Sequence, residues 1–303
     1  MEEGGTPVIY ELTAESAAGQ RIDKYLSGQL ADLSRSYLQK LLKDGGVEVN
    51  KKPVKSNYKL SVGDQIRLEV PEAVEPEITA EDMDLDILYE DEDILVINKP
   101  TDMPVHPSAG NYENTLANGI AWYFAKKGED FVYRCINRLD RDTTGALILA
   151  KNPLSAAILS VQMKKRQILR TYLALVDGLL PDSGTINAPI ARMEGSVITR
   201  EVNFGTGESA ITHYERLAAG KEYSLAELHL ETGRTHQIRV HMKYIGHPLP
   251  GDYLYNPDYR RINRQPLHSY QLEFTHPTTG KVMLFTAPLP IDFISAFYSN
   301  SLK

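Results

Sequence analysis

The sequence has 303 residues, 42% hydrophobic and 24% charged, which excludes disorder and collagen-like repeats and predicts one large core and a small second one. A net charge of −7 argues at first sight against a partner as acidic as nucleic acid. The single cysteine, Cys135, excludes an internal disulfide, no apolar run is long enough to predict a membrane span, and the acidic N-terminus is not a signal peptide. We therefore expect a cytoplasmic protein that does not contact a membrane.

The charge is distributed unevenly along the chain. Residues 20–60 carry nine Lys and Arg against four Asp and Glu, whereas residues 71–95 carry eleven acids and no Lys or Arg. Residues 126–170 are basic again, with ten against four. The overall acidity therefore comes from one short stretch, and two basic regions remain that would attract an acidic partner.

The first 70 residues predict a small αβ module. Segment 35–43 is an amphipathic helix, which Ser34 begins as N-cap and Gly45-Gly46 ends. Its apolar face comprises Tyr37, Leu38, Leu41 and Leu42, and its basic face comprises Arg35, Lys40 and Lys43. Short strands follow at 47–50 and 65–70. We expect a domain at 1–70, an acidic Pro-containing linker at 71–83, and a second domain at 84–303.

The second domain begins with an apolar strand at 93–99, which Pro100 ends. Further apolar runs predict strands at 145–150, 171–176, 225–230 and 271–274, and a helix at 153–163. Helices and strands do not alternate regularly, so the pattern favours an α+β fold over a doubly wound sheet.

A loop rich in charged and hydroxyl side chains, residues 136–145, leads directly into one of these strands. Loops fixed to rigid strands are common places for functional sites. Asp140 lies between Arg138 and Arg141, which favour its ionised form, as a nucleophile or a cation-binding group requires. The alternative is an aspartate that caps a turn between surface arginines.

A second candidate segment, 231–241, follows the strand at 225–230. Thr232-Gly233 indicates a turn, after which Arg234 can present its donors to a carboxylate or phosphate. His236, His241 and His247 raise the question of a metal, but the sequence offers no Cys partner and no His-Glu-x-x-His spacing. Ordinary hydrogen bonding is the favoured interpretation, and we expect no metal.

A third segment is basic. Lys164, Lys165, Arg166 and Arg170 precede the strand at 171–176, which contains Tyr172. Such a patch attracts acidic substrates, although a run of charge is equally compatible with a solvated face, and Tyr172 by itself is typical of a core residue.

Taken together, these segments resemble the RluA-type pseudouridine synthases over nearly the whole chain. The motifs that carry the resemblance are Asn137-Arg138-Leu139-Asp140 with Thr143-Thr144-Gly145, then 170–178, then 232–241, with support from 95–100, 105–107, 246–248, Gly251-Asp252, Leu267-His268 and 276–280. The first 70 residues resemble the RNA-binding module named after small-subunit ribosomal protein S-four.

The resemblance implies a role for each motif residue. Asp140 matches the catalytic nucleophile, Arg234 the arginine that pairs with it, and Tyr172 the tyrosine that packs on uracil and serves in proton transfer. Arg138 matches the residue that fills the base stack after the target has flipped out. Further RNA contacts are expected from His106, Arg141, Thr144, Lys164, Lys165, His236 and Arg239, and from Arg35, Lys40 and Lys43 of the N-terminal helix.

The resemblance also implies a mixed, mostly antiparallel sheet with a central RNA-binding cleft. It implies a monomeric isomerase that acts on large-subunit ribosomal RNA without a cofactor, a metal or an obligatory protein partner. Alternatives are a tRNA-directed synthase, a non-catalytic ribosome-assembly factor, and a glycoside hydrolase using Asp142 as second acid. Two positions depart from the family: Asn137 stands where a histidine is usual, and Pro250 where an apolar residue is common.

Overall fold

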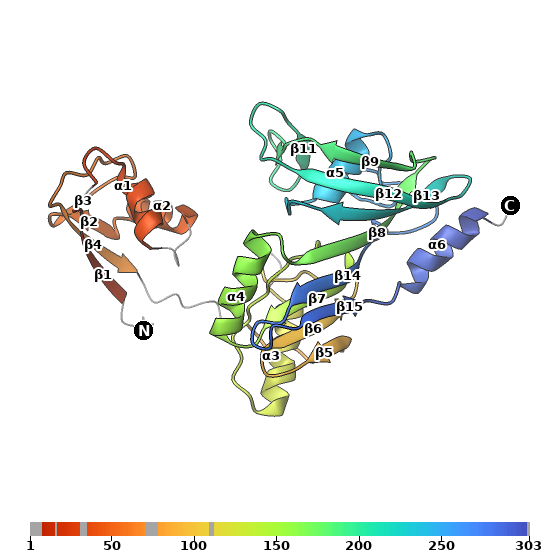
Figure 1. The fold of residues 1–303 in the computed structure, drawn as a ribbon, viewed down its shortest axis with the longest axis horizontal. Coiled ribbons are helices and arrows are strands. Elements are labelled where there is room, and N and C mark those ends of the chain that lie inside the picture. The colour runs from red at the N-terminus through yellow and green to blue at the C-terminus, as the bar shows by residue number, and fades with distance from the viewer. Residues whose placement is uncertain (1–7, 16, 31–34, 71–77, 109–111, 302–303) are drawn as a thin grey trace. The chain divides into compact units, whose positions relative to one another are not determined.

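The computed structural model describes residues 8–301 except 16, 31–34, 71–77 and 109–111. The chain divides into two compact units, Met1–Glu77 and Ile78–Lys303 (Figure 1). The predicted linker, 71–83, spans this division; its first seven residues, like the predicted N-cap Ser34, lie outside the described residues. No helix among the described residues combines the length and apolarity needed to cross a bilayer.

The N-terminal unit packs two helices on a small antiparallel sheet. Its strands are ordered β1-β4-β2-β3. The elements are β1 (Val8–Thr13), α1 (Ile22–Gln29), α2 (Arg35–Asp44), β2 (Val47–Val49), β3 (Lys52–Pro53) and β4 (Gln65–Val70). Leu38, Leu41 and Leu42 of α2 are buried in the core of this unit, while Lys40 and Lys43 are exposed. The amphipathic helix predicted from the sequence is therefore present, with lysines on its outer side.

The C-terminal unit is built on a nine-stranded mixed sheet of order β5-β6-β7-β14-β8-β13-β12-β9, with β15 paired to β14. Its only parallel pairing among the described strands is β7 with β14. The strands are β5 (Ile87–Glu90), β6 (Ile94–Lys99), β7 (Thr144–Ala150), β8 (Leu169–Asp177), β9 (Ser183–Asn187), β12 (Ile211–Ala219), β13 (Tyr223–Leu230), β14 (Leu267–Thr275) and β15 (Val282–Thr286). A separate hairpin joins β10 (Ile190–Arg192) and β11 (Arg200–Val202). The predicted α+β class and mostly antiparallel sheet are confirmed.

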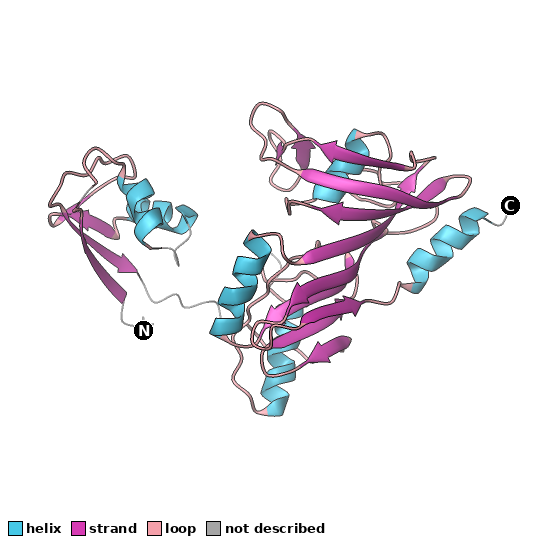
Figure 2. Ribbon diagram, in the orientation of Figure 1, coloured by secondary structure: helices cyan, strands magenta, loops and turns pink. Residues whose placement is uncertain are grey.

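Helices cover both faces of this sheet (Figure 2). They are α3 (Leu116–Lys127), α4 (Pro153–Lys164), α5 (Gln237–Tyr244) and α6 (Ile291–Ser301). Side chains of α3 and α5 pack in the same core as Leu147 and Tyr172, whereas α4 packs against Ile148 and α6 against Leu173. Because neighbouring strand residues point to opposite faces, Tyr172 faces the same side as α5.

The junction of β7 and β14 requires a glycine. Gly145 has φ +108°, and a Cβ atom there would collide with the carbonyl of Ser269 on β14. Only glycine adopts this conformation without strain. The close approach fixes the start of β7, and with it the loop that contains Asp140.

Candidate active site

Asp140 lies in the loop that precedes β7, and buried cations hold the backbone of this loop. Lys99, at the end of β6, is fully buried, and its Nζ donates hydrogen bonds to the carbonyls of Pro100 (2.7 Å), Met103 (2.8 Å) and Arg141 (2.8 Å). Burial lowers the pKa of Lys99 to about 7, while Asp142 and Asp140 oppose this effect. The residue that follows Asp140 is therefore fixed from the neighbouring strand.

Arg264, in the segment just before β14, holds the same loop. Its Nη1 donates to the carbonyl of Asp142 at 3.2 Å, and its Nε and Nη2 bind both carboxylate oxygens of Asp292 on α6, at 2.7 and 2.9 Å. Gln265 adds a hydrogen bond from its Nε2 to Thr143 Oγ1 at 3.3 Å. Segments far apart in the sequence thus keep Asp140 in one position.

The Asp140 carboxylate accepts a hydrogen bond from Arg239, on α5. Arg239 Nη1 is 2.8 Å from Asp140 Oδ2, and the remaining edge of the guanidinium binds Asp252 in bidentate geometry, at 2.6 and 2.8 Å. Arg239 is 1% exposed and Asp252 is fully buried, whereas the Asp140 side chain is 26% exposed. The arginine therefore bridges a buried carboxylate and one that faces open space.

The prediction that Arg234 pairs with Asp140 is therefore wrong, and Arg239, expected among the RNA contacts, makes this pair instead. The Arg234 side chain is 39% exposed, and it binds Glu208 at 2.5 Å and the carbonyl of Ser209 at 3.0 Å. Arg234 precedes α5, whereas Arg239 lies within the helix and is buried. The physical reason is the position at which α5 begins, between the two arginines, so that Arg234 stays in the preceding loop.

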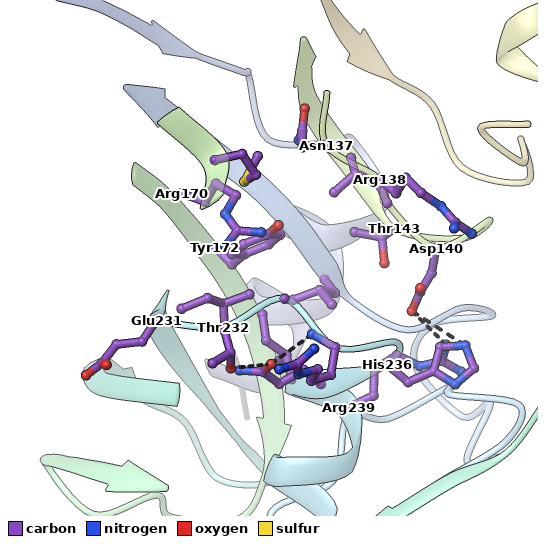
Figure 3. Close-up of a pocket in the computed structure, with 18 of the residues that line it drawn as sticks. Asn137, Arg138, Asp140, Thr143, Arg170, Tyr172, Glu231, Thr232, His236 and Arg239 are labelled. Carbon is purple, nitrogen blue, oxygen red and sulfur yellow. Dashed lines mark hydrogen bonds and ion pairs between the residues drawn. The ribbon is translucent and has the colours of Figure 1, made fainter. Parts of the chain in front are cut away.

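Asp140 and Tyr172 lie on opposite sides of a cavity of about 610 Å³, here called the first cavity (Figure 3). Tyr172, on β8, is buried, and this burial raises its pKa, so the phenol stays protonated at neutral pH. The lining carries an excess of positive charge: it holds two acids, Asp140 and Glu231, and six cations, Arg138, Lys164, Arg166, Arg170, Arg234 and Arg239. Within the described part of the chain, the buried Nε of Arg170 has no hydrogen-bond partner.

His236 lies beside this ion pair. Its Nε2 is 4.0 Å from Asp140 Oδ2, and its Nδ1 is 2.9 Å from the hydroxyl of Tyr255. Tyr255 also accepts the backbone N–H of Arg200. Burial lowers the pKa of His236, and the ring is therefore neutral at pH 7, with Nε2 on the side of Asp140.

Comparisons with known proteins show to which family the chain belongs. The family model described as RNA pseudouridylate synthase matches residues 93–244, and that of the S4 domain matches residues 20–66. The chain is 45% identical to the RNA pseudouridine synthase YlyB of Bacillus subtilis, over 93% of this chain and 95% of that protein. The chain belongs to the RNA pseudouridylate synthase family.

Two further relatives extend the comparison of this synthase. The ribosomal large subunit pseudouridine synthase D of Vibrio parahaemolyticus is 38% identical, over 95% of this chain and 93% of that protein. The solved structure of human RNA pseudouridylate synthase domain containing 1 is 29% identical, with a TM-score of 0.58 over 69% of this chain and 85% of that one. The resemblance found in the sequence, including the RNA-binding S4 domain, is confirmed.

The remaining predicted contacts of the synthase fall into three groups. Arg138 and Lys164 line the first cavity, and His106 and Arg141 line a neighbouring one. Lys165 is exposed outside both linings, Lys40 and Lys43 are exposed on α2 of the N-terminal unit, and the side chain of Arg35 lies outside the described residues.

Thr144 lines neither cavity, so its predicted RNA contact is wrong. It is buried at the start of β7, and its hydroxyl is 2.8 Å from His268 Nδ1. The strand begins one residue earlier than the sequence pattern indicated, which draws Thr144 into the sheet.

Both departures from the family pattern are accommodated in this synthase. Asn137 is buried, and its Oδ1 accepts the backbone N–H of Ile148 at 2.9 Å, so it fixes the loop to β7. Pro250 is buried before Gly251, whose φ of +70° turns the chain toward Asp252. Neither change disturbs the contact between Arg239 and Asp140.

The histidines that raised the question of a metal have separate partners. His241 is hydrogen-bonded to Thr212 Oγ1 (2.9 Å) and the carbonyl of Ala188 (2.8 Å), and His247 to the carbonyl of Asp177 (2.7 Å). Sequence reasoning assigned no role to Lys99, Asp252 or Arg264. Lys99 and Asp252 lie in stretches that support the family resemblance, which was the available signal for them, whereas Arg264 lies in a polar loop without periodicity.

Proposed function

We propose that this synthase isomerises uridine to pseudouridine in large-subunit ribosomal RNA, with Asp140 as its nucleophile. The target class is supported by the relatives named ribosomal large subunit pseudouridine synthase D, four of which are 37–38% identical over more than 90% of this chain. The monomeric state and the cytoplasmic location expected from the sequence are part of this proposal.

One observation carries the proposal: a partly exposed carboxylate, bound by a buried arginine, faces an aromatic ring across a positively charged cavity. The reaction needs an ionised carboxylate, a cation that keeps it in place, and a surface on which a base can lie. Asp140, Arg239 and Tyr172 provide these groups in that order.

The isomerisation breaks the N-glycosidic bond, turns the uracil and joins its C5 to the same ribose carbon. A proton leaves C5 and N1 gains one, so no atom is lost and no electron is transferred. Asp140 forms and then releases a covalent bond with the nucleoside. The target must leave its stack to reach Asp140, at a cost of about a few kcal/mol, and Arg138, exposed at the mouth of the cavity, is placed to fill the vacated position.

The proposal is tested by mapping pseudouridines at single-nucleotide resolution in total RNA. Three strains are compared: one with the protein, one without it, and one carrying Asp140→Asn, which keeps the size of the side chain. We expect at least one large-subunit site to vanish in both altered strains. A site lost from tRNA would redirect the substrate class. A site lost only in the deletion strain would exclude Asp140 as nucleophile, and no lost site would favour a binding factor.

A further inference from the structure

Asp140 is shared by two cavities. A second cavity, of about 390 Å³, adjoins the first one at the loop and at α5. Five residues line both of them: Arg138, Leu139, Asp140, His236 and Arg239. Tyr172 lines only the first cavity, and His106, Arg141 and Tyr253 line only the second. The Asp140 carboxylate therefore lies at the boundary between two spaces of different composition.

This arrangement constrains the path of the RNA, given the proposed function. The bond that reacts joins the uracil to its ribose, so a uracil beside Tyr172 places the ribose next to Asp140. The ribose carries a phosphodiester on each side, and the second cavity is the adjoining space at Asp140. One neighbouring nucleotide is thereby directed into it.

The chemistry of the second cavity suits a nucleotide. Tyr253 is 45% exposed, and its ring centroid lies 5.7 Å from Arg141 Cζ and 5.5 Å from Arg239 Cζ. Half-exposed aromatic rings are the surfaces on which unpaired bases stack. The lining holds three arginines, Arg138, Arg141 and Arg239, against the two aspartates Asp140 and Asp142. The Arg141 side chain is 52% exposed, and its ion pairs within the described residues are with Asp142 at 3.2 Å and Asp102 at 3.6 Å, which a phosphate can displace.

We propose that the second cavity is a subsite for the nucleotide next to the target uridine. Tyr253 stacks on the base of that nucleotide, and Arg141 contacts the phosphate that joins it to the target. The inference rests on the proposed function and adds a residue that recognises the flank of the target. Because every base has a face on which to stack, the subsite tolerates sequence and requires an unstacked neighbour.

The test uses the full chain and an RNA stem–loop transcribed around the uridine mapped above. Two further RNAs lack the base of the 5′ or the 3′ neighbour. We expect Tyr253→Ala to lower kcat/KM on the intact RNA by roughly 10- to 100-fold, and Tyr253→Phe to preserve it. On one of the two abasic RNAs, the kcat/KM of the wild type should be as low as that of Tyr253→Ala on the intact RNA. On the same abasic RNA, Tyr253→Ala should lower kcat/KM no further.

Tyr244→Ala is the matched control, because Tyr244 is 54% exposed and lines neither the first nor the second cavity. Arg141→Met tests the subsite independently if Tyr253→Ala fails to fold. The fall in kcat/KM that Arg141→Met causes on the intact RNA should disappear on an RNA with an uncharged methylphosphonate between the target and its neighbour.

Equal falls in kcat/KM for Tyr253→Ala on the intact and abasic RNAs would overturn the subsite. They would show that Tyr253 acts by packing against Arg239 and not by stacking on a base. An unaffected Tyr253→Ala enzyme would overturn it as well. Both outcomes leave the proposed function intact, whereas a wild-type chain that forms no pseudouridine in any RNA contradicts the function itself.

Discussion

Arg239 shares its guanidinium between two carboxylates of different accessibility. Its bidentate contact with the buried Asp252 fixes the plane of the group, and only Nη1 is left for Asp140. An ammonium group is a point donor and cannot make both contacts in this geometry. The orientation of the nucleophile therefore depends on an arginine at position 239.

Arg239→Lys should reduce turnover by roughly 100- to 1,000-fold, the loss that follows removal of one preorganised charged donor. Arg234→Lys is the matched control, because Arg234 lines the first cavity but binds Glu208 instead of Asp140. We expect it to raise KM and to leave kcat nearly unchanged. Steady-state kinetics on the mapped RNA separate the two variants, and a larger fall in kcat for Arg234→Lys would contradict the geometry.

Lys99 holds the Asp140 loop, but its burial makes the free energy of unfolding depend on pH. Its burial lowers its pKa from 10.5 to about 7, so the folded protein binds this proton less tightly than the unfolded chain. The free energy of unfolding therefore rises with pH between about 7 and about 10.4, and the stability gained over that window is lost as pH falls to about 7.

Replacing Lys99 by Met removes the titrating group and therefore tests this pH dependence of the unfolding free energy. The difference in unfolding free energy between wild type and Lys99→Met should shift in favour of the wild type as pH rises above about 7, by at most about 1.4 kcal/mol per pH unit. Urea denaturation at several pH values measures it. Turnover of Lys99→Met should fall at every pH, since the carbonyl of Arg141 loses its donor. Stability curves that stay parallel would show that Lys99 does not titrate in this window.

The sequence located the carboxylate and the tyrosine of the candidate site, but not the arginine that binds the carboxylate. Asp140 and Tyr172 each lie in one long family motif next to an apolar strand, so the motif alone locates them. Arg234 and Arg239 share one motif, and spacing cannot decide which of them faces inward. That choice depends on where α5 begins, and His236, in the left-handed region at φ 58°, supplies no side-chain cap that a sequence pattern would reveal.

At the scale of elements, α6 connects to the catalytic loop through one arginine. Asp292, in the first turn of α6, binds both Nε and Nη2 of Arg264, whose Nη1 holds the carbonyl of Asp142. Phe293 and Ala296 fix the helix on the sheet. A terminal helix that lines neither the first nor the second cavity thus contributes to the position of Asp140.

Asp292→Ala should lower the free energy of unfolding by roughly 1–2 kcal/mol, because it leaves the buried Arg264 without its carboxylate, while solvent at the half-exposed Asp292 limits the loss. Turnover should fall with it. Asp258→Ala is the control, since it removes the carboxylate partner of Arg260, whose side chain is 72% exposed. Thermal and chemical denaturation compare the two variants. Equal stability of both would show that α6 is held by its apolar contacts alone.

Apolar patterning explains which elements were predicted. The central strands β6, β7, β8, β13 and β14 each contain apolar runs, and all of them were expected. The outer strands β9 and β12 are half-exposed and read as irregular polar sequence. Their pairing depends on long-range register with β13, which no local pattern specifies.

At the scale of the whole molecule, the chain has a net charge of −7, yet each of its two units presents a group of basic side chains. The N-terminal unit presents Lys40 and Lys43 on the exposed side of α2, and the C-terminal unit surrounds Asp140 with arginines. Phosphate contacts supply affinity without sequence information, while the flipped base supplies selection. We expect the first unit to govern affinity and the second to govern turnover.

Replacing Lys40 and Lys43 by Ala in the full chain should weaken RNA binding and flatten its salt dependence, by roughly 0.7–0.9 in the log–log slope for each phosphate that the variant no longer neutralises. The value of kcat at saturating RNA should not change. Deleting residues 1–75 should produce a larger effect in the same direction.

Ala substitutions at Lys221 and Lys281, exposed lysines outside both cavities, remove the same charge and serve as the control. Binding is measured across a range of salt concentrations. An unchanged slope for the α2 variant would show that this helix does not contact phosphate.

The supports of the Asp140 loop also bear on how the site assembles during folding. Lys99 and Asp292 are separated by 193 residues, with Arg239 and Arg264 between them. Contacts of such sequence separation close late, because the entropy of the intervening chain must be overcome first. We therefore expect the loop to fold before the contact between Arg239 and Asp140 forms.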